Sequence, residues 1–166
     1  SVSAEVLNQV TETAFIDWLN RYVTTEGAPA GAYRVHRYLA YDFDTVSEGI
    51  GWGMLILALL DNNHHPTKKY FDGLWQYYQS HLNKYGLMSW KIDRFGTVEG
   101  ADSASDADQN TAMALFFAHK QWGSRGKVNY QAAGTQLLLR IVSYEVSGKS
   151  PRENDFVLKP GADWWG

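Results

Sequence analysis

The sequence predicts an all-α fold whose helices pair into an α/α arrangement. Five segments repeat apolar residues every three or four positions, which is the period of an α-helix. Two of them, 47–61 and the middle of 106–122, are apolar on nearly every side, whereas the others carry one apolar stripe. A helix buried all round belongs to an inner layer and a striped helix to an outer layer, so the alternation indicates inner helices paired with outer ones.

The first helix is the clearest element. Apolar residues recur from Leu7 to Tyr22, while Ser3 is a suitable N-cap and Gly27 a suitable stop. Residues 28–44 contain glycine, proline and several tyrosines without helical spacing, so we expect an extended loop there.

The other four helices are expected at 47–61, 67–82, 106–122 and 130–146. The turn at Pro66 ends the second helix, and residues 86–93 have the pattern of a short strand or an extended loop. Trp18 and Trp75 fall on the apolar stripes of outer helices, so we expect both in the core.

Length and composition limit the function classes. The 166 residues have the size of one domain, 1–166. A net charge of −3 without a basic run argues against nucleic-acid binding. The longest apolar run, Met54–Leu60, is too short for a membrane span, and no signal peptide is expected within the chain. There are no cysteines, and the adjacent His64 and His65 lack metal-site spacing, so we expect no metal and no cofactor.

Glu48 is the first candidate for chemistry. It stands between Ser47 and three glycines at the start of an otherwise apolar helix. Glycines at such a place let another chain or a ligand approach the backbone closely. The ordinary alternative is capping, in which Ser47 caps the helix and Glu48 interacts with the helix dipole.

A second group of acids, Asp102, Asp106 and Asp108, precedes the other inner helix. Capping accounts for one of these carboxylates but not for three. A calcium loop is disfavoured because the acids lack the spacing of an EF-hand and its closing glutamate.

The residues around both groups of acids resemble two motifs of glycoside hydrolase family 8. The segment Ser47–Met54 is similar to the family's Ser-Glu-Gly-x-Gly-Tyr-Gly-Met motif, with Trp52 in the place of the tyrosine. Residues 104–108 and the helix after them resemble the family's signature helix, although Thr111 and Phe116 depart from it. The likeness covers the chain from about residue 33 to its last residue.

The resemblance implies an (α/α)6 barrel, a toroid of helices of which this chain is the N-terminal half. Members of the family cleave β-1,4-linked polysaccharides with inversion, and endoglucanases acting on cellulose-type β-glucan are the commonest. By the motif match Glu48 is the general acid, and Asp106 is a carboxylate that holds and distorts the central sugar. The catalytic base is then expected beyond Gly166.

Other functions stay open at this point. The chain could be a chitosanase or xylanase of the same family, a catalytically incomplete carbohydrate-binding fragment, or a helical interaction module without a sugar ligand. Half a barrel exposes apolar inner helices, so we expect the remainder of the barrel, as further chain or a second copy, to be a partner. We expect a secreted or periplasmic protein.

Aromatic residues beside the two motifs are expected to bind sugar. Because aromatic faces suit the apolar faces of sugar rings, we expect Trp90, and with it Trp52 and Trp164, to be substrate platforms. We also expect Glu48 and Asp106 to open onto one cleft.

Neither of the other two acids near the signature helix is expected to be the base. Asp108 is expected to act as a partner of the helix dipole. Asp102 is expected on the same side of the substrate as Asp106, where it could not hold water on the opposite face of the sugar.

Overall fold

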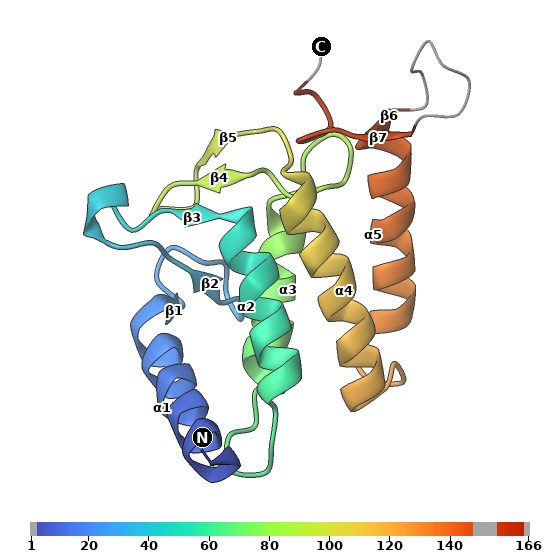
Figure 1. Cartoon of the computed structure of the whole chain (residues 1–166). Helices are drawn as coiled ribbons and strands as arrows, with labels where there is room; N and C mark the ends of the chain where they lie inside the picture. The colour runs from blue at the N-terminus through green and yellow to red at the C-terminus, as the bar shows by residue number, and fades with distance from the viewer. Residues whose placement is uncertain (1–2, 148–155, 165–166) are drawn as a thin grey trace.

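The computed structural model describes residues 3–147 and 156–164. Within them the chain forms five α-helices (Figure 1), which are α1 (Ala4–Tyr22), α2 (Ser47–Leu60), α3 (Lys68–Ser80), α4 (Ser105–Trp122) and α5 (Tyr130–Tyr144). All five lie within two residues of the expected bounds, apart from the earlier end of α1. The predicted all-α class is confirmed. No helix in the described ranges is both long and apolar enough to cross a membrane.

Short strands occupy the connections between the helices. They are β1 (Val23–Thr24), β2 (Arg34–Val35), β3 (Thr45–Val46), β4 (Lys91–Ile92), β5 (Val98–Gly100), β6 (Val146–Ser147) and β7 (Val157–Leu158). They pair antiparallel as β1–β2, β3–β4–β5 and β6–β7. The expected loop at 28–44 therefore contains β2 and a short 3-10 helix, Leu39–Tyr41.

The helix starts illustrate how local chemistry sets the boundaries. The predicted N-cap Ser3 is confirmed, because its hydroxyl accepts a hydrogen bond from the Val6 amide. The alternative interpretation in which Ser47 caps α2 is wrong, because the N-cap position is Val46. Ser47 is already inside the helix and buried, and its amide donates to the Trp90 carbonyl. A main-chain hydrogen bond to the residue before β4, rather than a capping side chain, therefore satisfies the first turn of α2.

The helices form two layers (Figure 1). α2 and α4 run side by side in the same direction, with α3 packed on α2 and α5 packed on α4 in the opposite direction. The N-terminal ends of α2 and α4 consequently lie at one end of the molecule, next to the β3–β4–β5 sheet. At the opposite end Asp61 accepts hydrogen bonds from the Thr67 amide and the Trp122 indole, which ties α2, α3 and α4 together.

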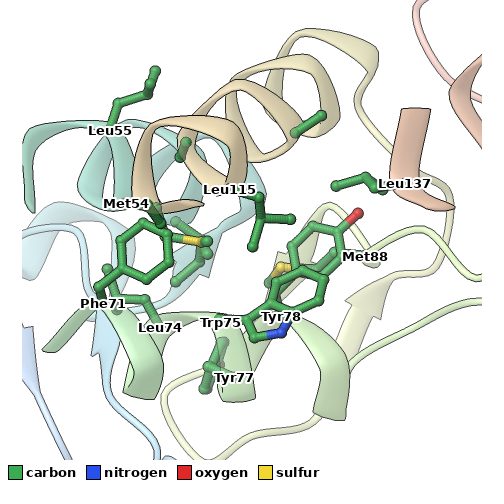
Figure 2. Close-up of a cluster of buried hydrophobic side chains, with 14 of the residues drawn as sticks. Met54, Leu55, Phe71, Leu74, Trp75, Tyr77, Tyr78, Met88, Leu115 and Leu137 are labelled. Carbon is green, nitrogen blue, oxygen red and sulfur yellow. The ribbon is translucent and has the colours of Figure 1, made fainter. Parts of the chain in front are cut away.

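The core lies between α2, α3, α4 and α5 (Figure 2). The buried side chains that fill it include Met54, Phe71, Leu74, Tyr77, Tyr78, Met88 and Leu115. Trp75 is buried as predicted, whereas Trp18 is half-buried against the core. The expectation that the two inner helices are buried all round is only partly met, because Trp52 and Leu59 of α2 and Met113 of α4 are exposed.

Glycine sets the distance between the two inner helices. A Cβ placed at Gly51 would lie 2.7 Å from the Ala107 carbonyl oxygen and 3.2 Å from the Thr111 hydroxyl oxygen. Any side chain there would overlap with the backbone of α4, so the first turns of α2 and α4 approach closely only because residue 51 has none.

Candidate active site

Glu48 lies in the first turn of α2, at the end where α4 also begins. Its side chain is half-buried, and the Ser47 hydroxyl donates a hydrogen bond of 3.5 Å to its Oε2. The Arg37 guanidinium is close enough that Glu48 contributes to raising the Arg37 pKa, although a hydrogen bond to Asp44 is the main cause. Glu48 is thus accessible and has one positive group nearby.

Asp106 lies in the first turn of α4 and is exposed. It directly precedes Ala107, whose carbonyl oxygen faces Gly51 of α2. Since Glu48 lies one turn before Gly51, the two carboxylates belong to neighbouring first turns at the same end of the inner layer (Figure 1). That they open onto one cleft stays a prediction.

The backbone of Trp90 joins the two segments. Its amide donates to the Asp102 carbonyl over 2.7 Å, and its carbonyl accepts from the Ser47 amide over 2.9 Å. Trp90 therefore stands between the residue before Glu48 and the loop that leads to Asp106. Its half-buried indole lies against Gly100, where a Cβ would come within 2.2 Å of the indole nitrogen.

The two other aromatic candidates are more exposed. Trp52 follows Glu48 by one turn of α2 and is 57% exposed. Trp164 is 54% exposed and lies over Gly161, which itself contacts the Ser103 carbonyl in the loop before α4. All five candidate residues thus come from segments at or next to the N-terminal ends of the inner helices, while their roles in catalysis and sugar binding stay predictions.

A charged loop borders this end of α2. Arg37 donates two hydrogen bonds, of 2.7 and 2.6 Å, to the buried Asp44 carboxylate. Lys91 pairs with Glu99 at 2.7 Å and lies 3.8 Å from Asp44. These groups line a surface hollow of about 370 Å³ beside the β3–β4–β5 sheet.

A buried arginine holds the same loop in place. Arg34 is 2% exposed and donates to the carbonyl of Phe43, the carbonyl of Glu26 and the Thr45 hydroxyl. Phe43 and its neighbour Asp42 both adopt positive φ, at 54° and 52°, which costs a non-glycine residue free energy. Arg34 therefore stabilises a strained turn just before the helix that carries Glu48.

Asp102 and Asp108 have different surroundings in the structure. The Asp102 carboxylate accepts hydrogen bonds from the amides of Ser103 and Asp163, so it fastens two loops. Asp108 lies in the first turn of α4 as expected, but its assignment as a partner of the helix dipole is wrong. Its carboxyl group is completely buried, it accepts from the Tyr78 hydroxyl, and burial followed by the charge of Glu145 raises its pKa well above the usual range.

Sequence reasoning missed Glu145, the partner of Asp108. The buried residues of α5 are Tyr130, Gly134, Leu137 and Ile141, and Glu145 continues their spacing by one further turn. That periodicity could have placed Glu145 on the inward face. Among the described residues, no group of three or more potential ligands is arranged to hold a metal ion.

Comparison with known proteins agrees with this architecture. Residues 1–166 match the sequence profile of the glycosyl hydrolases family 8. The chain is 37% identical over 162 residues to Endoglucanase 2 of Ruminiclostridium josui, covering 96% of this chain and 33% of that protein. It is 36% identical over 168 residues to a beta-glucanase of Niallia circulans, covering 98% of this chain and 38% of that protein.

The fold is shared with solved structures as well. The apo structure of a beta-1,3-1,4-glucanase from Paenibacillus sp. X4 superposes with a TM-score of 0.86 at 34% identity, covering 99% of this chain and 42% of the other. The chain thus spans about a third of the length of the curated relatives and somewhat more of the solved chain. The motifs, the two layers of helices and these likenesses together establish that the chain belongs to glycosyl hydrolase family 8.

Proposed function

We propose that this chain supplies the acid side of the active site of an endo-acting β-glucan hydrolase. The observation that carries the proposal is the common end of the inner helices, where Glu48 and Asp106 occupy neighbouring first turns and Trp90 links their segments. Relatives named as endoglucanases and a beta-glucanase support β-glucan, most simply a β-1,4-linked chain, as the substrate.

The roles of the two carboxylates follow from inverting chemistry. Glu48 donates its proton to the leaving glycosidic oxygen, and the exposed Asp106 accepts hydrogen bonds from the hydroxyl groups of the central sugar. A base then activates water on the opposite face of that sugar, about 6.5–9.5 Å from the acid. Trp90, Trp52 and Trp164 offer apolar faces to neighbouring sugar rings.

The base in this proposal lies outside residues 1–166. Asp102 is engaged by two backbone amides, and Asp108 is buried beneath Tyr78 with no open side. Neither is free to hold a water molecule against a sugar. The remainder of the barrel, which we propose supplies the base, would also cover the apolar side chains that α1 and α5 expose, namely Val6, Leu7, Val10, Leu138, Leu139 and Val142.

A polymeric substrate also bears on location. A β-glucan chain does not pass an intact cell membrane, so we propose that the protein acts after secretion or in the periplasm. No part of the proposed reaction uses a nucleic acid, a membrane or a cofactor.

Turnover by the purified 166-residue chain, verified by mass, tests the proposal. Reducing ends would be assayed on mixed-linkage β-glucan, carboxymethyl cellulose, chitosan and xylan. We expect weak binding of β-1,4-linked oligosaccharides and little or no hydrolysis by the chain alone, with β-glucan hydrolysis restored by the remainder of the barrel. Preference for chitosan or xylan would overturn the substrate assignment, and binding without restored turnover would identify a carbohydrate-binding fragment. Robust hydrolysis by the chain alone, abolished by Asp102→Ala or Asp108→Ala, would refute the placement of the base.

A further inference from the structure

Asp108 and Glu145 form a buried pair of carboxyl groups that the proposed reaction does not use. Asp108 comes from the first turn of α4, and Glu145 directly follows α5. Both residues are 0% exposed. Two ionised carboxyl groups buried close together repel each other strongly, which favours a state in which one of them is protonated.

Each carboxyl group has one oxygen with a donor and one without. The Tyr78 hydroxyl donates to Asp108 Oδ1, and the Ser103 hydroxyl donates to Glu145 Oε1 over 2.7 Å. The remaining oxygens, Asp108 Oδ2 and Glu145 Oε2, are buried without a donor from any other group. The two carboxyl groups lie close enough that each alters the pKa of the other, and a proton held by one of them would give both free oxygens a partner.

The charged surroundings favour keeping that proton. Burial is the largest cause raising the pKa of Asp108, and also that of Glu145. The nearby Asp102 adds to the shift of Glu145, while Lys159 and the hydrogen bond from Ser103 oppose it. Among the described residues no salt bridge reaches either carboxyl group, and the Lys159 ammonium donates to the Ala162 carbonyl.

The pair lies where the segment 156–164 meets the start of α4. The amide of Lys159 donates to the Glu145 carbonyl over 2.7 Å, and the Ser105 amide donates to the Pro160 carbonyl over 2.9 Å. The Ala162 amide donates to the hydroxyl of Ser103, the same hydroxyl that holds Glu145. The segment is therefore bound to α4 and α5 through the residues that contact the carboxyl pair.

We propose that Asp108 and Glu145 share one proton and act as positioning residues, which fasten the segment 156–164 to the N-terminal end of α4. Through this contact they hold Trp164 and Asp106 in a fixed relation. When the shared proton is lost at alkaline pH, the two carboxylates repel each other and the segment separates from α4. The fastening is independent of the proposed function, whereas its effect on sugar binding rests on that function.

Infrared spectroscopy detects the shared proton directly. The protein at neutral pH should show the C=O stretching band of one protonated carboxylic acid. Asp108→Asn, in which an amide replaces the protonated group, should lose this band, and so should Glu145→Gln, because either amide can donate to the remaining carboxylate. Asp17→Asn is the matched control, since Asp17 is an exposed carboxylate of α1, and it should keep the band. Absence of the band from the unaltered protein would overturn the proposal.

Amide hydrogen exchange tests the fastening. After correction for intrinsic exchange rates, protection of residues 156–164 should fall by up to about tenfold per pH unit across the range in which the closed pair still holds its proton and the opened carboxyl groups do not, since opening then releases one proton. The fall should level off once the pH exceeds the raised pKa of the closed pair. Asp108→Asn and Glu145→Gln should remove this pH dependence, with the second variant serving if the first does not fold. A pH dependence equal to that of the unaltered protein in both variants would refute the proposal.

Oligosaccharide binding separates this proposal from the proposed function. If oligosaccharide binding weakens over the same alkaline pH range in which residues 156–164 lose their protection from hydrogen exchange, both proposals are supported. If no oligosaccharide binds at any pH while the band and the protection behave as described, the proposed function fails and the shared proton remains supported.

Discussion

Replacing Gly51 by alanine tests the close approach of the two inner helices. The new Cβ would lie 2.7 Å from the Ala107 carbonyl oxygen, whereas ordinary contacts begin at 3.4 Å, so one helix must retreat by several tenths of an ångström. Overpacking of this kind costs about 1–3 kcal/mol, and the upper half applies because the obstacle is backbone rather than a mobile side chain. Alanine recovers at most about 1 kcal/mol of helix propensity, which leaves a net loss of about 1–2 kcal/mol.

Gly49→Ala is the matched control, because it lies in the same turn of α2 and gains the same propensity. Its Cβ would meet only Val35, at 3.6 Å or more, which is ordinary contact. We expect Gly49→Ala to be neutral or stabilising and the two variants to differ by about 2 kcal/mol, or roughly 4–8 °C in melting temperature for a chain of this size. Thermal and urea unfolding would measure the difference. Equal stability of the two variants would show that Gly51 is not what allows α2 and α4 to approach closely.

Three further predictions concern stability and binding. Arg34→Lys should lower the free energy of unfolding by about 2 kcal/mol or more, because a lysine ammonium cannot donate to the same buried carbonyls. The control Arg21→Lys, at an exposed position, should change the free energy of unfolding little. Burial opposes ionisation of Asp61, but hydrogen bonds outweigh it and lower its pKa. Its contribution to stability is therefore present at neutral pH and lost as the pH falls through that lowered pKa, so Asp61→Asn should be less stable than the unaltered protein at neutral pH and the difference should narrow in acid. Trp90→Ala should weaken oligosaccharide binding, measured by calorimetry, more than it lowers the melting temperature. The buried Trp75→Ala should instead cost about 3–5 kcal/mol of stability. A Trp90→Ala variant that loses stability but binds oligosaccharide normally would contradict the role of Trp90 as a sugar platform.

The helices could be predicted from the sequence because their signals are local. Ser3 caps α1, and the turn after Asp61 ends α2 before Pro66, so each boundary depends on a few adjacent residues. The strands could not be predicted as pairs, since β3 contains only two residues and exists because Thr45 faces Ile92 from a distant part of the chain. Such contacts are decided by tertiary structure.

The candidate site was predictable only where a motif marked it. Glu48 and Asp106 were found because glycines and neighbouring acids are unusual at the start of apolar helices. Asp108 was misread, because an acid in a first turn ordinarily interacts with the helix dipole in solvent. Its burial depends on Tyr78 of α3 and on Glu145, which are far away in sequence, and no local pattern around Asp108 reveals them.

The central claim is that Glu48 donates the proton to the leaving oxygen. It is tested most directly by the leaving-group dependence of Glu48→Gln in the complete catalytic domain, with the exposed Glu99→Gln as control. On unactivated β-glucan we expect Glu48→Gln to lose about 10²–10⁴-fold in kcat. On a dinitrophenyl cello-oligosaccharide, whose leaving group needs no proton, most of that loss should disappear. An equal loss on both substrates, or no loss on β-glucan, would contradict the assignment of Glu48 as the general acid.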